Sequence, residues 1–210
     1  MRGYFPVSLK LEGRRCLVVG GGRVALRKAR ALLDAGAEVV AVAPRFDAAF
    51  RKIKGEVSLI RKRYAGTDIR GCAFVVAATS DAKVNARVSR DARRRRIPVN
   101  VVDVPDLSDV IIPSTLRRGG FTISVSTGGA SPLLAQKVRR ELEKFFPKVY
   151  SGYVSLLGEL RRAVLARPIS AAGKRRALRG LLDERGLAIY LEKGRAAARA
   201  YLLKKLGDED

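Results

Sequence analysis

The most constraining feature of this sequence is a glycine turn that joins a buried strand to an amphipathic helix. Residues 17–19 are aliphatic without a polar break, as a strand of a parallel sheet buried on both faces requires. Three consecutive glycines, 20–22, follow directly, and apolar side chains then recur at helical spacing as far as Gly36, a residue type that often ends a helix. The stretch therefore predicts a strand, a tight turn and a helix, which together form half of a nucleotide-binding unit.

The alternation of strand and helix continues through the first half of the chain. Four further strands are expected at "EVVAVAP" (38–44), "VSLIRKRY" (57–64), "CAFVVAAT" (72–79) and "IPVNVVDV" (97–104), with a helix from about Asp81 to Arg95. Parallel strands that follow one another in this way need right-handed crossovers. We therefore predict an α/β fold with an N-terminal Rossmann-like, doubly wound parallel sheet.

Several polar groups follow the strands at their carboxyl ends. In a doubly wound sheet, ligands bind beyond these ends, near the point where the strand order reverses. Pro44 and Arg45 follow the second predicted strand, residues 79–81 follow the fourth, and Asp103 follows the fifth. We expect these groups to converge on the glycine turn.

The glycine turn has the spacing Gly20-x-Gly22-x-x-Ala25, in which alanine takes a position where only close packing of helix on strand is at stake. Glycines permit positive φ and close approach of a pyrophosphate, and the helix N-terminus supplies amide donors. The pattern therefore favours a dinucleotide site over a turn that serves packing alone. The usual acidic ribose ligand is missing, which leaves NAD and NADP open. Arg45 either pairs with a 2′-phosphate or is an incidental surface arginine.

The chain is strongly basic, with 43 Lys and Arg residues against 20 acidic ones and a formal net charge of +23. Three interpretations stay open: solvated helix faces of an arginine-rich protein, a polyanionic small substrate, and nucleic acid. The run Arg93 to Arg96 points round most of a helix circumference, which favours a helix C-terminus over a reader of a DNA groove.

Other features of the composition place the chain among globular proteins without a membrane anchor. An apolar content of 47% is enough for a core, and no run of about 18 apolar residues or signal-peptide pattern is present. We expect a cytoplasmic protein. Cys16 and Cys72 each lie in an apolar stretch, so we interpret them as small buried side chains and expect no metal site.

The pattern changes after Asp103. "VIIPSTLRRGGFTISVST" predicts two strands around a Gly-Gly turn, followed by a helix that starts near Ser131 with Pro132 at its first position. The loop before this helix is rich in hydroxyls, and it either holds a carboxylate or phosphate or forms only a helix cap and a tight turn. Three helices are expected from Tyr150 onward, separated by Pro168 and Gly186. The predicted regions are 1–113, a nucleotide-binding domain; 114–148, a small central α+β region; and 149–210, a helical domain.

Four blocks occur in a fixed order: "FPVSLKLEGRRCLVVGGGRVALRKARALLDAGAEVVAVAP", "VVAATSDAKVN", "IPVNVVDVPDLSDVIIPS" and "ISVSTGGASPLLAQKVRRELE". Together they closely resemble the siroheme synthase family, in particular its precorrin-2 dehydrogenase and sirohydrochlorin ferrochelatase module. The resemblance runs from about Tyr4 to Phe146, and beyond it only the helical character is similar. No methyltransferase domain follows, so the chain resembles the standalone form.

The resemblance implies NAD-dependent oxidation of the tetrapyrrole precorrin-2 to sirohydrochlorin, insertion of Fe²⁺ in some members, and a homodimer formed through the central region. By position it implies a cofactor pocket lined by Gly20, Gly22, Arg23, Val24, Pro44, Arg45, Thr79, Ser80 and Asp81, with Asn85 supporting the loop. It implies that Asp103 is the essential acidic residue. Substrate contacts are expected from Asn100, Ser126, Thr127, Gly128 and Ser131. Thr127 stands where some relatives have a serine that can be phosphorylated.

The chemistry of a dehydrogenation agrees with this resemblance. A hydride must pass to nicotinamide and a proton to a base, and Asp103 after the fifth strand is placed to be that base. The chain has no histidine, so iron insertion through an imidazole ligand is excluded. An alternative function is an NAD(H)-sensing or nucleic-acid-binding module. We find no helix-turn-helix signature for it, and aromatic residues make up only 6% of the chain.

Overall fold

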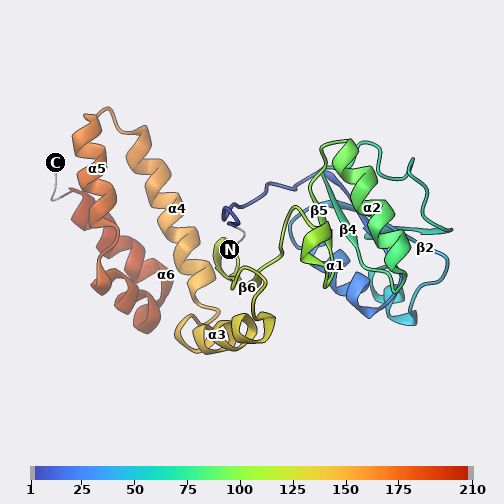
Figure 1. Ribbon diagram of the computed structural model, residues 1–210. Coiled ribbons are helices and arrows are strands. Elements are labelled where there is room, and N and C mark those ends of the chain that lie inside the picture. Colours follow the sequence, from blue (N-terminus) through green and yellow to red (C-terminus); the bar gives the residue numbers. More distant parts are fainter. Residues whose placement is uncertain (1–2, 208–210) are drawn as a thin grey trace. The chain divides into compact units, whose positions relative to one another are not determined.

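The computed structural model describes residues 3–207, and the chain divides into two compact units (Figure 1). The first unit ends at Ile112 and the second begins at Pro113. The first unit has two apolar clusters in its core, and the second has an apolar cluster of its own. Each unit therefore has a core of its own.

The first unit is built on a five-stranded sheet with the order β3-β2-β1-β4-β5, in which every neighbouring pair is parallel. The strands are β1 (Arg15–Val19), β2 (Glu38–Ala43), β3 (Val57–Arg61), β4 (Phe74–Ala77) and β5 (Val99–Val101). The helices are α1 (Arg23–Leu33) and α2 (Ala82–Arg94), with short 3₁₀ helices η1 (Ala48–Ile53) and η2 (Pro105–Leu107). The predicted Rossmann-like α/β fold is confirmed.

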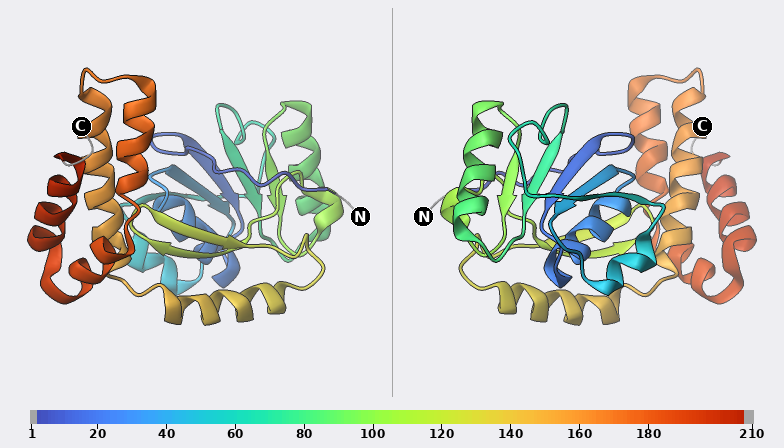
Figure 2. Two further views of the ribbon diagram at one scale, coloured as in Figure 1. Left: turned by 90° about the vertical axis from the view of Figure 1, so that its left-hand side faces the viewer. Right: turned by 90° about the vertical axis from the view of Figure 1, so that its right-hand side faces the viewer.

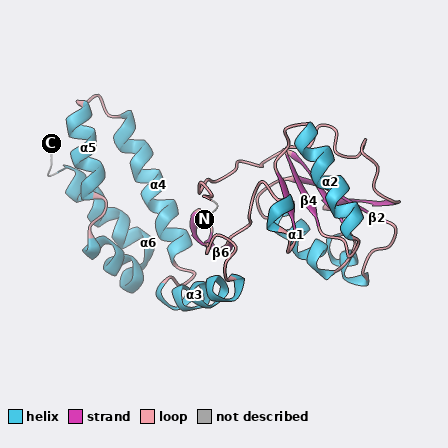
Figure 3. Cartoon of the chain, viewed as in Figure 1, coloured by secondary structure: helices cyan, strands magenta, loops and turns pink. Residues whose placement is uncertain are grey.

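The sheet is apolar on both faces because α1 covers one face and α2 covers the other (Figure 3). Along β1, Cys16 packs with the residues of α1, and the next side chain, Leu17, packs with those of α2. This alternation is the period of two that a strand imposes. Cys16 and Cys72 are both buried, as the sequence predicts, and burial raises the pKa of the Cys16 thiol to about 11.

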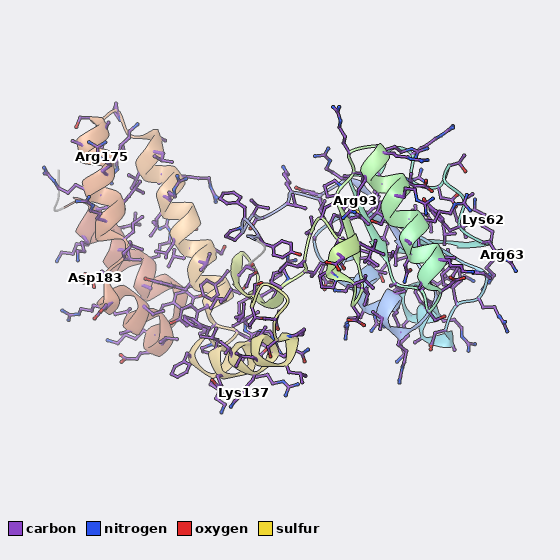
Figure 4. All side chains as sticks on the ribbon, viewed as in Figure 1. Lys62, Arg63, Arg93, Lys137, Arg175 and Asp183 are labelled. Atoms are coloured by element: carbon purple, nitrogen blue, oxygen red, sulfur yellow. The ribbon has the colours of Figure 1, made fainter. Side chains whose placement is uncertain are left out.

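The two helices of the first unit end where the sequence predicts a stop. Gly36, just beyond α1, has a φ of 76°, and its amide donates to the Leu33 carbonyl at 2.8 Å. The arginine run lies at the end of α2, where Arg93 (labelled in Figure 4) donates to Asp109 at 2.9 Å and to the Asp106 carbonyl at 3.2 Å. The basic side chains thus lie at the negative end of the α2 dipole.

The second unit begins with an antiparallel hairpin of β6 (Ser114–Arg118) and β7 (Phe121–Val125), which turns at Gly119 with a φ of 58°. Helix α3 (Pro132–Phe145) packs along this hairpin (Figure 2). The remaining helices are α4 (Tyr150–Ala166), α5 (Ala171–Gly180) and α6 (Glu184–Gly207). They enclose a separate cluster centred on leucines of α4 and α6. The division into a central and a helical region stays a prediction.

The prediction that Gly186 separates the last two helices is wrong. Helix α5 ends at Gly180, and Gly186 lies buried in the first turns of α6, where an added Cβ would come within 2.9 Å of Leu202. An added Cβ would therefore displace the buried Leu202 side chain. The break lies at Asp183, whose carboxylate accepts from the Arg185 amide at 2.7 Å. A hydrogen bond from Lys205 keeps the pKa of Asp183 below its usual range.

The sequence analysis did not predict a further break within α6. Gly194 has a φ of 82°, so the helical path kinks there. Over the residues that the structure describes, none of the helices combines the length and apolar character needed to cross a membrane.

Candidate dinucleotide site

The glycine turn lies at the carboxyl edge of the sheet between β1 and its two neighbours, β2 and β4. The Gly20 amide donates to the Val42 carbonyl at 2.9 Å, and the Ala78 amide donates to the Val19 carbonyl at 2.8 Å. Strand β1 lies between β2 and β4. The strands that follow β1 in sequence are first added on the side of β2 and then on the side of β4, so the turn after β1 lies where the strand order reverses. This is the position at which doubly wound sheets bind ligands.

The three glycines of the turn have different surroundings. A Cβ on Gly20, whose φ is 134°, would lie 2.4 Å from the Ala78 carbonyl oxygen, and a Cβ on Gly21 would lie 2.0 Å from that of Arg45. A Cβ on Gly22 would meet nothing within 4 Å. The first two glycines therefore let three chain segments meet, and the third leaves open space in front of the helix that follows.

The N-terminus of α1 faces this open space without a side-chain cap. Gly22 is the N-cap residue, no hydrogen bond from a side chain caps the first turn, and that turn contains no acidic residue. Arg23 and Val24, the first two helical residues, are exposed. The uncapped amides and the helix dipole therefore favour an anion such as a pyrophosphate.

The loop after β2 folds over the glycine turn, as predicted from the topology. The Asp47 amide donates to the Gly21 carbonyl at 2.7 Å, and the Asp47 carboxylate accepts from the Ala49 amide at 2.8 Å at the start of η1. Pro44 and Arg45 are exposed, and within residues 3–207 no hydrogen bond or ion pair engages the Arg45 guanidinium. The contact through Asp47 was missed by sequence reasoning, although "FDAA" has the pattern of a capping residue before a helical turn.

The loop after β4 is held by a buried amide. Asn85 accepts from the Thr79 hydroxyl at 2.8 Å and from the Thr79 amide at 3.2 Å, and its Nδ2 donates to the Thr79 carbonyl at 2.9 Å. Asp81 is the N-cap of α2, where its carboxylate accepts from the Lys83 and Val84 amides at 2.8 and 3.2 Å. Ser80 is exposed between them. Thr79 and Asp81 thus shape the loop at this edge of the sheet, and the Thr79 hydroxyl and one carboxylate oxygen of Asp81 are already engaged within it.

Replacing Asp81 by alanine should destabilise the first unit without removing the sheet. Loss of an N-cap costs about 1 kcal/mol, which lowers the melting temperature of a chain of this size by about 2–4 °C. Asp81→Ser is the matched control, because serine can cap the same helix. Thermal unfolding followed by circular dichroism measures the difference; equal melting temperatures for the alanine and serine variants would contradict the assigned cap.

Asp103 follows β5 at the same edge of the sheet and has a strained backbone. Its φ is 60°, and it occupies the third position of a turn closed by a 3.2 Å hydrogen bond from the Val104 amide to the Val101 carbonyl. Glycine or asparagine is the usual residue at such a position. The Val102 amide donates to the Ala77 carbonyl at 2.9 Å, which ties the turn to β4. Asp103 is exposed, and within the described chain no hydrogen bond engages its carboxylate.

Lys28, on α1, is a second charged residue near Asp103 that the sequence did not single out. Burial lowers the pKa of its amine, as does the neighbouring Arg27, and the Asp103 carboxylate acts in the opposite direction. Lys28 precedes the buried Leu32 by one helical turn, a spacing that places it beside the buried stripe of α1. The Lys28 amine and the Asp103 carboxylate therefore lie within electrostatic reach of each other beside the glycine turn, at the carboxyl edge of the sheet where doubly wound folds have their ligand crevice.

Asn100, a predicted substrate contact, is buried on β5. Its Nδ2 donates to the Val110 carbonyl at 2.9 Å, and its Oδ1 has no hydrogen-bond partner. An unpaired buried oxygen is uncommon and points to a missing donor.

The hydroxyl-rich loop belongs to the second unit. Ser126 accepts from the Gly128 amide at 3.1 Å, Thr127 accepts from the Ser131 amide at 2.9 Å, and Ser131 accepts from the Leu134 amide at 3.3 Å. Gly128 has a φ of 64°. These contacts are those of a helix cap and a tight turn, which was one of the two interpretations left open by the sequence.

Two family descriptions match successive parts of the chain. "Putative NAD(P)-binding" matches residues 7–114, about half of the chain, and "Sirohaem biosynthesis protein central" matches residues 118–144. The first match covers the sheet and the crevice, and the second covers most of the hairpin and α3.

Relatives with a curated description match about three quarters of this chain. Siroheme synthase of Ectopseudomonas mendocina is 44% identical over 156 residues, which is 74% of this chain and 34% of the relative. Siroheme synthase of Azotobacter vinelandii is 45% identical over 161 residues, 76% of this chain and 34% of the relative. The chain thus spans about a third of the length of these relatives.

A solved structure titled "SirC, precorrin-2 dehydrogenase" matches the chain over nearly its full length. The match covers 98% of this chain and 100% of the other, with a TM-score of 0.75 and 28% identity. The fold and the glycine crevice define an NAD(P)-binding protein of the Rossmann-like class. The chain belongs to the siroheme synthase family.

Proposed function

We propose that this chain oxidises precorrin-2 to sirohydrochlorin with NAD as the hydride acceptor. The single observation that carries the proposal is the match to a precorrin-2 dehydrogenase over 98% of this chain and all of the other. The curated relatives are longer and are named for the whole of siroheme synthesis, so they support the pathway more than the individual step.

The residues of the crevice fit a dinucleotide. Gly22 leaves open space before the uncapped amides of α1, where a pyrophosphate is stabilised by amide donors and by the helix dipole. Asn100 provides a buried oxygen that still needs a donor, such as an amide of a bound group. When bound, NAD supplies a nicotinamide ring that accepts a hydride.

In this proposal Asp103 removes the proton that accompanies the hydride. Its exposed carboxylate is free of hydrogen bonds within the described chain, so it can accept a proton from a substrate without first breaking an internal contact. The left-handed backbone at Asp103 fixes where the carboxylate can point. The Asp103 carboxylate raises the pKa of the Lys28 amine against the effect of burial, so the two groups lie within electrostatic reach of each other.

The surplus of basic residues suits a substrate that carries many carboxylates. Arg23 and Arg45 flank the glycine turn, and the described chain engages neither guanidinium in an ion pair. A crevice lined by one sign of charge raises the local concentration of an oppositely charged substrate. The net charge of +23 is larger than one substrate requires, so part of it serves the exposed helix faces.

A homodimer is the proposed assembly, and α3 is its proposed contact surface. Leu133, Leu134 and Phe145 on this helix are 78%, 52% and 71% exposed, which is unusual for large apolar side chains on one helix. The family resemblance implies pairing through this same central region.

Leu133→Glu should weaken the proposed dimer. A buried, unpaired carboxylate at an apolar interface costs several kcal/mol, enough to increase dissociation by about 100-fold. Gln136→Glu, an exposed position on α3, is the control for the added charge. Light scattering after gel filtration measures the mass: a wild-type monomer, or a Leu133→Glu variant that stays dimeric, would contradict the assignment of α3.

The proposed reaction is tested by anaerobic incubation of the purified chain with precorrin-2 and NAD. Formation of NADH together with the sirohydrochlorin spectrum is expected, and a parallel reaction with NADP measures the cofactor preference. A chain that binds NAD but leaves precorrin-2 unchanged would overturn the proposal and favour an NAD(H)-sensing role. Ferrous iron added to the same cuvette, against a protein-free control, tests whether siroheme also forms.

A further inference from the structure

The described part of the chain contains four buried polar residues, and all of them brace loops at the carboxyl edge of the sheet. They are Asn85, Ser89, Asn100 and Ser108. Asn85 holds the loop after β4, as described above. The other three contact the end of β5 and residues 102–110, which follow it and include Asp103. Buried polar groups are costly unless they are paired, so their concentration here fixes the shape of this loop.

Ser108 makes the closest set of contacts to the turn of Asp103. Its Oγ accepts from the Val101 amide at 2.9 Å and lies 3.1 Å from the Val101 carbonyl and 3.0 Å from the Val104 carbonyl. Its one proton can be donated to either carbonyl. Val101 and Val104 are the first and last residues of the turn, so one hydroxyl holds both ends.

The turn needs such support because the hydrogen bond that closes it is long and its backbone at Asp103 is left-handed. Its closing hydrogen bond, from the Val104 amide to the Val101 carbonyl, is 3.2 Å long. A left-handed backbone costs a residue other than glycine about 1–2 kcal/mol. No hydrogen bond within residues 3–207 holds the Asp103 carboxylate itself, so its direction depends on the backbone of the turn.

We propose that Ser108 is the positioning residue that keeps the Asp103 carboxylate aimed at the substrate. The hydroxyl stabilises the left-handed turn, and without it the turn relaxes toward negative φ and the carboxylate swings away. The part of this inference that concerns turnover rests on the proposed role of Asp103. The part that concerns the turn does not.

Ser108→Ala tests the inference, with Ser89→Ala as the matched control. Ser89 is also buried, and its hydroxyl donates to the Leu107 carbonyl at 2.6 Å, in the same loop but outside the turn. Ser108→Ala should lower kcat about tenfold and leave the KM for NAD unchanged, because loss of a buried hydrogen bond changes an equilibrium by about that factor. Ser89→Ala should change kcat by less than about twofold. Equal losses in the two variants would make Ser108 merely structural and overturn the proposal.

A double variant separates positioning from general damage. In the Asp103→Asn background, Ser108→Ala should cause no further loss of turnover, because the carboxylate that it positions is already gone. A further tenfold loss would show that Ser108 acts elsewhere.

Amide exchange of the wild-type protein and the Ser108→Ala variant tests the turn without the reaction. The amides of Val101 and Val104 should exchange about tenfold faster in the variant, while those of β1 stay unchanged. Unchanged exchange at both amides would overturn the inference. If the wild-type chain does not oxidise precorrin-2 but these amides respond as expected, the proposed function fails and the support of the turn by Ser108 stands.

Discussion

Asp103→Asn is expected to retain the fold and NAD binding and to lose at least about 100-fold in kcat for precorrin-2 oxidation, because a general base contributes about 10²–10⁴-fold. Asparagine removes the proton-accepting charge but keeps the size of the side chain. It also tolerates the left-handed backbone, whose φ is 60°, at least as well as aspartate. The melting temperature should therefore change by no more than about 2 °C.

The control for this variant is Asp106→Asn, which removes the same charge three residues along the same loop. It should retain most of the turnover. Steady-state kinetics with NAD and precorrin-2 give kcat, and equilibrium titration gives NAD affinity. Full activity of Asp103→Asn would remove Asp103 from the mechanism. Equal losses of kcat in both variants would mean that the negative charge of the loop matters for turnover and that Asp103 is not a specific base.

The features that the sequence predicts well are those set by local spacing. The uninterrupted aliphatic run at 17–19 requires a strand buried on both faces, and the following glycines and helical spacing require a turn and a helix. Because parallel strands end at one edge, the positions of Arg45, Thr79 and Asp103 at that edge follow from the strand order. The hydrogen bonds at Gly20 and Val102 confirm the closeness of these segments.

The features that the sequence misses depend on which residues meet in space. From the sequence, Gly186 is interpreted as the end of a helix. In the structure it is buried within α6, and the Leu202 side chain packs close to the position that its Cβ would take. Ser108 reads as a loop serine, and its three contacts exist only because the chain after β5 folds back along that strand. From the sequence, Lys28 is indistinguishable from a surface lysine, since spacing along α1 does not reveal that the turn after β5 brings a carboxylate nearby.

Substitutions at two neighbouring glycines of the turn should have opposite effects on stability and on NAD binding. Gly21→Ala should destabilise the first unit by about 1–3 kcal/mol, which lowers its melting temperature by several degrees, because the new Cβ would lie 2.0 Å from the Arg45 carbonyl oxygen and 2.9 Å from the Ala43 Cβ. The loop after β2 would have to move, and with it the Asp47 amide that donates to Gly21.

Gly22→Ala should do the reverse, retaining stability while weakening NAD binding by about tenfold or more. Its Cβ would meet nothing within 4 Å, so the fold has room for it, but it would occupy the open space in front of α1 that the pyrophosphate needs. Thermal unfolding and NAD titration of both variants separate the two effects. If Gly22→Ala bound NAD as tightly as the wild-type protein, the dinucleotide would not approach the chain at this glycine, and the crevice would have to bind its cofactor through the loops after β2 and β4 alone.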